Sequence, residues 1–194
     1  HHPRFAQTVL RNQPGLVMVR PGARSPMDRL LGRRGLDAEL CDQLRRPILF
    51  FRNTWPWQRI LLPVSYSDLK IRAAEVALDL TRQLDASLTA MNVDLPRYIS
   101  GLEEEIVHEE VVPSRKLCEL YEVALDYRHA WGNPVQHLVQ EAENHDLVIV
   151  GRRAERRDTW FDPDVAMRVA REAPCSVLVL TQAEDEWRHA SRRG

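Results

Sequence analysis

The chain has 194 residues, with 27 basic and 28 acidic side chains and a formal net charge of −1 at pH 7. Its 44% apolar and 28% charged residues are typical of a globular protein with one or two domains. The balanced charge argues against a nucleic-acid partner, and no apolar run approaches the roughly 20 residues of a membrane-spanning helix. Three scattered cysteines without a C-x-x-C pair favour a reducing compartment, so we expect a cytoplasmic protein.

The first 52 residues predict two helices and two short apolar strands. The expected order is a helix over 3–13, a strand over 16–19, a loop over 20–35, a helix over 37–44 and a strand over 48–51. Residues 53–57, Asn-Thr-Trp-Pro-Trp, read as a linker.

The next segment, 58–182, alternates strands with helices. The expected strands are 60–64, 87–93, 124–131, 146–150 and 176–181. The expected helices are 69–84, pieces within 103–121 broken at Pro113, 134–144 and 164–172, with a loop over 151–163 and a polar tail over 183–194. This alternation predicts a doubly wound parallel α/β sheet with helices on both faces. Ligands bind such sheets at the carboxyl ends of strands, here after Val64, Val93 and Val150.

An internal repeat relates the beginning of the chain to its end. Residues 15–51 and 146–180 both run apolar strand, arginine-rich segment, helix and apolar strand. Leu16 and Leu147 lie 131 positions apart, whereas Ile48 and Val177 lie 129 apart. Residues 1–52 therefore read as the second half of a first copy, and we expect the native protein to be longer. We predict that Ile48–Phe51 lies beside Val177–Leu180, covered by Trp55-Pro56-Trp57, because an apolar strand edge would otherwise be exposed.

Three segments resemble the universal stress protein (UspA-like) family: Ile60–Val64, Asp146–Gly151 and Ala173–Leu180. The resemblance covers 58–181 and extends to 3–51, as in a tandem protein with a truncated first domain. It implies a five-stranded α/β domain with strand order 3-2-1-4-5. It also implies a homodimer, or an intramolecular pseudo-dimer, formed through the last strands.

The family's ATP-binding members carry an Asp after the first strand, then G-x-x-G, nine residues and G-[S/T]. Here Ser65 replaces the Asp, Gly151 is retained, Ala154 replaces the second glycine, and Pro163-Asp164 replaces the last pair. Pro163 has no N–H to donate, and Asp164 would repel a phosphate by roughly 1–4 kcal/mol at about 4 Å. We therefore expect that ordinary ATP binding is lost and that no cofactor is held.

The candidate ligand-binding residues lie at strand ends and in the loop after 150. They are Ser65, Val93, Gly151, Arg152, Arg153, Ala154, Asp164 and Val165. The arginines of this loop suit either an anion-binding cluster or a solvated loop balanced by acidic neighbours. Ser65 suits either ligand contact or a turn before the helix. The histidines lack metal-ligand spacing, and Cys175 reads as a core residue.

Catalytic patterns are missing from the sequence: it contains no G-x-S-x-G, P-loop or G-x-G-x-x-G. We interpret the chain as a non-enzymatic binding or regulatory module in stress response, acting through dimerisation or a small anionic ligand. Two alternatives remain open. One is a nucleotide-binding protein or nucleotide hydrolase with a degenerate phosphate loop, and the other is a cytoplasmic regulatory domain of a transporter.

Overall fold

The computed structural model describes residues 15–20, 47–52, 54–64, 69–94, 122–153 and 163–182. Several expected features lie outside these residues. They are the helices over 3–13 and 37–44, the helical pieces within 103–121, most of the loops over 20–35 and 151–163, and the polar tail.

Among the described residues, seven strands form one sheet in the order β1-β2-β7-β6-β3-β4-β5. The strands are β1 (Val17–Val19), β2 (Ile48–Phe50), β3 (Arg59–Val64), β4 (Ser87–Asp94), β5 (Leu125–Trp131), β6 (Leu147–Arg153) and β7 (Ser176–Gln182). From β3 onward the neighbours pair in parallel, and numbering these five from β3 gives the expected order 3-2-1-4-5. The predicted α/β fold class is confirmed.

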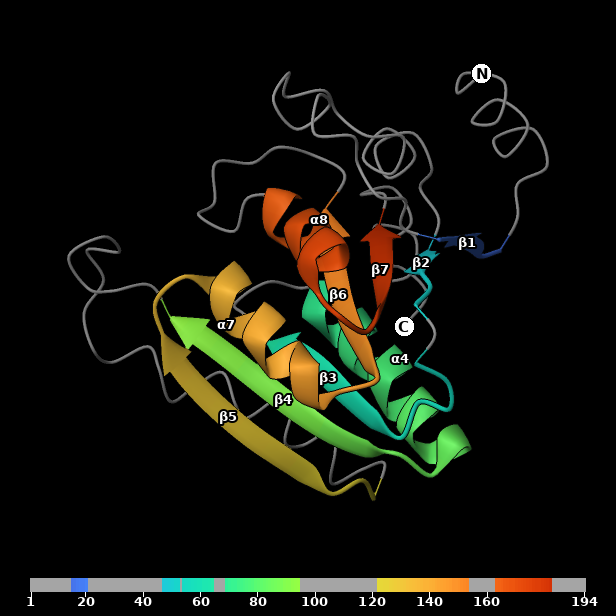
Figure 1. Cartoon of the computed structure of the whole chain (residues 1–194). Helices are drawn as coiled ribbons and strands as arrows, with labels where there is room; N and C mark the ends of the chain where they lie inside the picture. Colours follow the sequence, from blue (N-terminus) through green and yellow to red (C-terminus); the bar gives the residue numbers. More distant parts are fainter. Residues whose placement is uncertain are drawn as a thin grey trace, which may run out of the picture.

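Helices cover both faces of the sheet (Figure 1). Helix α4 (Leu69–Leu84) lies on one face, and α7 (Pro134–Glu141) and α8 (Pro163–Glu172) lie on the other. A 3-10 turn, η2 (Ala142–Asn144), extends α7. Two apolar clusters result. One packs Ala77 and Leu78 of α4 against the sheet, and the other packs Leu138 of α7 and Val169 of α8 against its opposite face.

The start of α7 is set by Asn133 and Pro134. The side-chain oxygen of Asn133 accepts a hydrogen bond from the backbone N–H of Val135 at 3.0 Å. Proline at the first helical position loses no intrahelical bond there. The turn before it requires Gly132, whose φ of +136° is rarely open to other residues.

The predicted docking of the two terminal pieces is confirmed. Strand β2 pairs antiparallel with β7, with Leu49 opposite Leu178 and Phe50 opposite Val177. Trp57 packs on the apolar cluster of the α4 face, which includes Leu49. Trp55 does not cover the junction as expected: it is 61% exposed and meets Trp57 edge to face, with ring centroids 5.3 Å apart.

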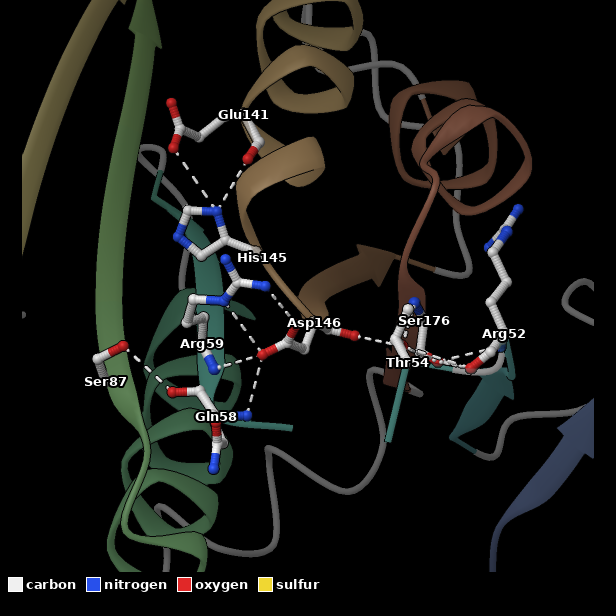
Figure 2. Close-up of polar contacts among 9 residues, drawn as sticks. All are labelled: Arg52, Thr54, Gln58, Arg59, Ser87, Glu141, His145, Asp146 and Ser176. Atoms are coloured by element: carbon white, nitrogen blue, oxygen red, sulfur yellow. Dashed lines mark hydrogen bonds and ion pairs between the residues drawn. The ribbon is translucent and has the colours of Figure 1, made fainter. Parts of the chain in front are cut away.

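Polar contacts join the linker to β7 at the amino edge of the sheet (Figure 2). Thr54 Oγ1 donates to the carbonyl of Asp146 at 2.7 Å and lies 2.9 Å from Ser176 Oγ. The backbone N–H of Arg52 donates to Ser176 Oγ at 3.0 Å. These contacts hold the end of β2 against the start of β7.

Asp146, which precedes β6, forms a second set of contacts there (Figure 2). Its Oδ2 accepts hydrogen bonds from the backbone N–H groups of Gln58 at 3.1 Å and Arg59 at 2.9 Å, and its Oδ1 lies 2.8 Å from Arg59 Nη2. Burial alone would raise the pKa of Asp146, but the hydrogen bonds from Arg59 and Gln58 lower it below its ordinary value. The carboxylate thus aligns the starts of β3 and β6.

Candidate functional site

The carboxyl end of β6 differs from the sequence expectation. Residues 151–153 were expected to begin a loop, but β6 continues through them and pairs Gly151 with Leu180 and Arg152 with Thr181. The expected boundary at Val150 is therefore wrong by three residues, because a flanking β7 extends the ladder of backbone hydrogen bonds past the apolar run. Gly151 is a strand residue here and not part of a phosphate-binding turn.

Arg152 is buried at this strand end, with 8% of its surface exposed. Alternation along β6 places it on the same face as Val148 and Val150, the face covered by α7 and α8. A solvated loop does not describe Arg152, since charged side chains are seldom buried. The expectation that Arg152 lies in a solvated loop is therefore wrong.

The N-terminus of α8 lies at the same edge of the sheet. The helix connects the carboxyl end of β6 to the amino end of β7, so it begins on the side where Arg152 lies. Unpaired backbone N–H groups at a helix start favour anions. Pro163 and Asp164 occupy its first positions, and Val165, half-buried, packs against the cluster on that face.

Val93 lies near the end of β4 and is 4% exposed. Its side chain belongs to the same apolar cluster as Val150 and Val165, so Val93 offers a ligand only its backbone. Ser65 and Ala154 lie outside the described residues, and Arg153 is described only as the last residue of β6. The structure thus places Val93 in one apolar cluster, Val165 against that cluster, and Arg152 at the end of β6.

A polar group at the ends of β4 and β5 was missed in the sequence. His129 Nε2 lies 2.7 Å from Asp94 Oδ2, and Asn92 Nδ2 donates to Asp94 Oδ1 at 3.2 Å. The His129 ring meets Trp131 edge to face at 5.1 Å, and Trp131 is 49% exposed. The available signal was an Asp at the end of one strand and a His near the end of the next, which parallel pairing brings together.

Within the described residues, no group of three or more His, Cys, Asp or Glu side chains could hold a metal ion. None of the helices described is long and apolar enough to span a bilayer. Cys175 is buried, and burial raises the pKa of its thiol to about 11.

The family model for the universal stress protein family matches residues 56–181. The chain belongs to the universal stress protein family. A universal stress protein from Methanocaldococcus jannaschii is 27% identical over 145 residues, which cover 67% of this chain and 85% of that protein. The expected family resemblance is confirmed.

Solved structures show the same fold over nearly the whole chain. A universal stress protein from Archaeoglobus fulgidus matches with a TM-score of 0.69 at 14% identity, covering 95% of this chain but 66% of that one. A functionally unknown protein from Pseudomonas aeruginosa matches with a TM-score of 0.67 at 17% identity, covering 100% of this chain and 72% of that one. This universal stress protein chain therefore spans about two thirds of the length of these relatives. A shorter family member, solved in complex with cAMP, matches with a TM-score of 0.51 at 21% identity, covering 64% of this chain and 96% of that one.

Proposed function

We propose that this chain is a cytoplasmic, non-enzymatic binding and regulatory module that takes up a small anion at the carboxyl edge of β6. The ligand carries a single phosphate or a carboxylate and contacts Arg152 and the start of α8. A guanidinium can hold such a group through two parallel hydrogen bonds. In ATP-binding relatives, backbone N–H groups of a glycine-rich loop donate hydrogen bonds to the phosphate. Here the planar guanidinium would donate them instead.

The observation that carries this proposal is the burial of Arg152 at the end of a continuous strand. Gly151 and Arg152 are held in extended conformation in the β6–β7 ladder, so neither lies in a phosphate-binding turn, although β6 pairs with β3 only at Leu147 and Val148. A triphosphate needs a run of unpaired backbone N–H groups. Pro163 offers none at the start of α8, and Asp164 adds a negative charge there. A ligand with one phosphate or one carboxylate therefore fits this edge better than ATP, which carries about four negative charges.

The proposal also includes an intramolecular pseudo-dimer, in which the last strands of the two copies, β2 and β7, pair within one chain. Strand β7 has β6 on one side and β2 on the other, so both of its edges are occupied within one chain. A homodimer through β7 would require β2 to leave. We therefore expect a monomer in light scattering at micromolar concentration. A dimer that disappears on substitution at β7 would contradict this part.

The alternative, a nucleotide-binding or hydrolysing protein, has two observations in its favour. A family member has been solved with cAMP. In this chain, Asp94 lies within hydrogen-bond distance of His129 and would orient it as a general base. The pair lies on β4 and β5, however, and β3 separates these strands from β6. The module proposal therefore expects His129→Gln to leave ligand binding unchanged.

Calorimetric titration of the full chain with inorganic phosphate, AMP, cAMP, ADP and ATP with Mg²⁺ tests the proposal. We expect AMP or cAMP to bind, ATP to bind no more tightly, and no turnover of any nucleotide. Arg152→Gln should weaken binding about 10-fold or more, the loss of a charge-assisted contact. The matched control Arg168→Gln changes an exposed arginine on α8 and should leave affinity unchanged.

Three results would overturn the proposal. They are ATP binding more than 10-fold tighter than AMP binding, nucleotide turnover that His129→Gln removes, and equal affinity of Arg152→Gln and the parent chain. Circular dichroism and urea unfolding of each variant separate loss of the site from loss of the fold.

A further inference from the structure

We propose that the outer edge of β5 is an interface at which a second copy of this chain pairs antiparallel, with Tyr127 of each copy on the two-fold axis. Among the described residues, β5 pairs with β4 and with no other strand. Figure 1 shows it at the margin of the sheet, far from β1. Pairing a strand with its own copy gives an isologous contact, in which each residue pair occurs twice. This edge differs from the last strands, β2 and β7, which pair within one chain.

The pleat of β5 separates its aromatic side chains from its charged ones. Leu125 packs against the apolar cluster of the α4 face, and Ala130 packs against the cluster of the opposite face. Successive side chains of a strand point to opposite faces. The α4 face therefore also carries Tyr127, His129 and Trp131, and the opposite face carries Asp126 and Arg128.

The two charges select one register for the pairing. Directly opposed residues of a continuous sheet point to the same face, so the two-fold axis has to pass through a residue. An axis at Asp126 or Arg128 would oppose like charges. An axis at Leu125 or His129 would leave Asp126 opposite an uncharged residue. An axis at Tyr127 places Asp126 of each copy opposite Arg128 of the other, which is the favourable arrangement.

The ends of the strand fit the same register. Glu122 and Gly132 have positive φ angles of 54° and 136°, and each lies five positions from Tyr127. The stretch between these two residues is therefore symmetric about the proposed axis. Trp131, 49% exposed, comes to lie opposite Val123, which packs against the cluster of the α4 face. Aromatic residues opposite β-branched residues are favourable cross-strand pairs.

Asp126 and Arg128 keep atoms available for a second copy. Arg128 Nε donates to Asp126 Oδ2 at 3.1 Å, and its Nη1 donates to Glu141 Oε1 on α7. Within the described part of the chain, Asp126 Oδ1 and Arg128 Nη2 make no hydrogen bond. The two side chains are 56% and 45% exposed, respectively. The contact with Glu141 thus holds the guanidinium beside the open edge without using all of its donors.

The interface is short, so the association is weak. One strand from each copy buries less surface than a stable dimer needs, and small interfaces belong to transient complexes. The pairing therefore lies above the micromolar range, where we expect a monomer.

Sedimentation velocity and light scattering of the full chain measure its mass as the concentration rises. We expect the mass to rise from that of one chain at about 10 μM towards that of two chains at about 1 mM. Hydrogen exchange of the amides in 125–131 should slow over the same range, because outward N–H groups become paired. The amides in 15–20, on the other outer strand, should exchange at an unchanged rate.

Two charge variants test the register. Asp126→Arg opposes two cations and Arg128→Asp opposes two anions, so each variant alone should associate about 10-fold more weakly or less. In an equal mixture of the two variants, every opposed pair joins a cation to an anion, and association should return to the level of the parent chain. The control Arg168→Asp changes an exposed arginine on α8 and should associate as the parent does. Circular dichroism and urea unfolding check the fold of each variant, since Arg128 also contacts Glu141.

A mass that stays at that of one chain up to about 1 mM would refute the interface. The proposal also fails when the mixture associates no more strongly than either variant alone. Slowed exchange in 15–20 instead of 125–131 would place the contact at β1 and contradict the assignment to β5. Should a charge variant fail to fold, the exchange of the parent chain decides. Arg152→Gln should leave association unchanged, so this proposal and the anion-binding proposal are tested separately.

Discussion

The guanidinium of Arg52 donates a hydrogen bond to the carbonyl oxygen of Ala170 at 2.9 Å, across 118 residues of sequence. It also donates to the backbone carbonyl oxygens of Arg171 at 2.9 Å and Cys175 at 3.1 Å. Carbonyl groups in the last turn of a helix lack intrahelical donors, and a cation there is favourable to the helix dipole. Arg52, two residues after the end of β2, thus caps the C-terminal end of α8.

We expect Arg52→Gln to lower the free energy of unfolding by about 2 kcal/mol, because three carbonyl oxygens lose a charged donor. Burial lowers the pKa of Arg52, but a guanidinium remains charged throughout the range of the measurement. Urea unfolding followed by circular dichroism measures the change. The control Arg168→Gln, on the exposed side of the same helix, should change the free energy by less than about 0.5 kcal/mol. Equal effects of the two variants would contradict the capping role.

Asp146 should make the protein more stable as the pH rises. Its pKa is lowered in the folded state, so from about pH 5 down through its ordinary pKa the unfolded chain binds more protons at this residue than the folded chain does. This stability is present above the unfolded pKa and is lost as the pH falls through the folded pKa. Asp146→Asn should therefore show a smaller gain in unfolding free energy across that range. Parallel curves for the parent and the variant would refute the assignment.

Cys175 should be nearly inert to thiol reagents in the folded protein. A thiol with a pKa of about 11 is roughly 0.1% thiolate at pH 8. In a Cys41→Ser/Cys118→Ser background, we expect the reaction with Ellman's reagent to be about 100-fold slower than for a free cysteine. The rate should recover in 8 M urea. Fast reaction without denaturant would show that the start of β7 opens readily.

Phe50 tests how strongly the terminal piece is attached. It is 1% exposed and lies on β2 opposite Val177. Phe50→Ala should cost about 3–5 kcal/mol, through lost burial and the cavity left behind. The control Trp131→Ala removes a comparably large but exposed aromatic residue and should cost less than about 1 kcal/mol. A small loss for Phe50→Ala would indicate that β2 contributes little to the sheet.

Apolar patterning in the sequence was sufficient to predict the strands and the junction. The runs at Ile60–Val64 and Asp146–Gly151 alternate with amphipathic helices, and this alternation leads to a parallel sheet. The repeat predicted the β2–β7 neighbour because an exposed apolar strand needs a partner. Both predictions rest on burial, which depends mainly on residue type and period.

The site was harder to predict, because it depends on tertiary register. Arg152 looks like a loop residue in the sequence, and only the pairing of Arg152 with Thr181 shows that the strand continues. Asp94 and His129 lie 35 positions apart, and they meet only because β4 and β5 are in a particular register. Arg52 likewise reads as a linker arginine until α8 is placed beside it.

The antiparallel pairing of β2 with β7 makes the two halves of the sheet run in opposite directions. Because β2 runs opposite to β7, the segment after Val19 leaves the sheet at one edge and the segment after Arg153 leaves it at the other. Arg20, directly after β1, and Arg152, near the end of β6, therefore lie at opposite edges of the sheet. The two halves of the repeat face away from each other across the ladder that pairs Ile48–Phe50 with Val177–Val179.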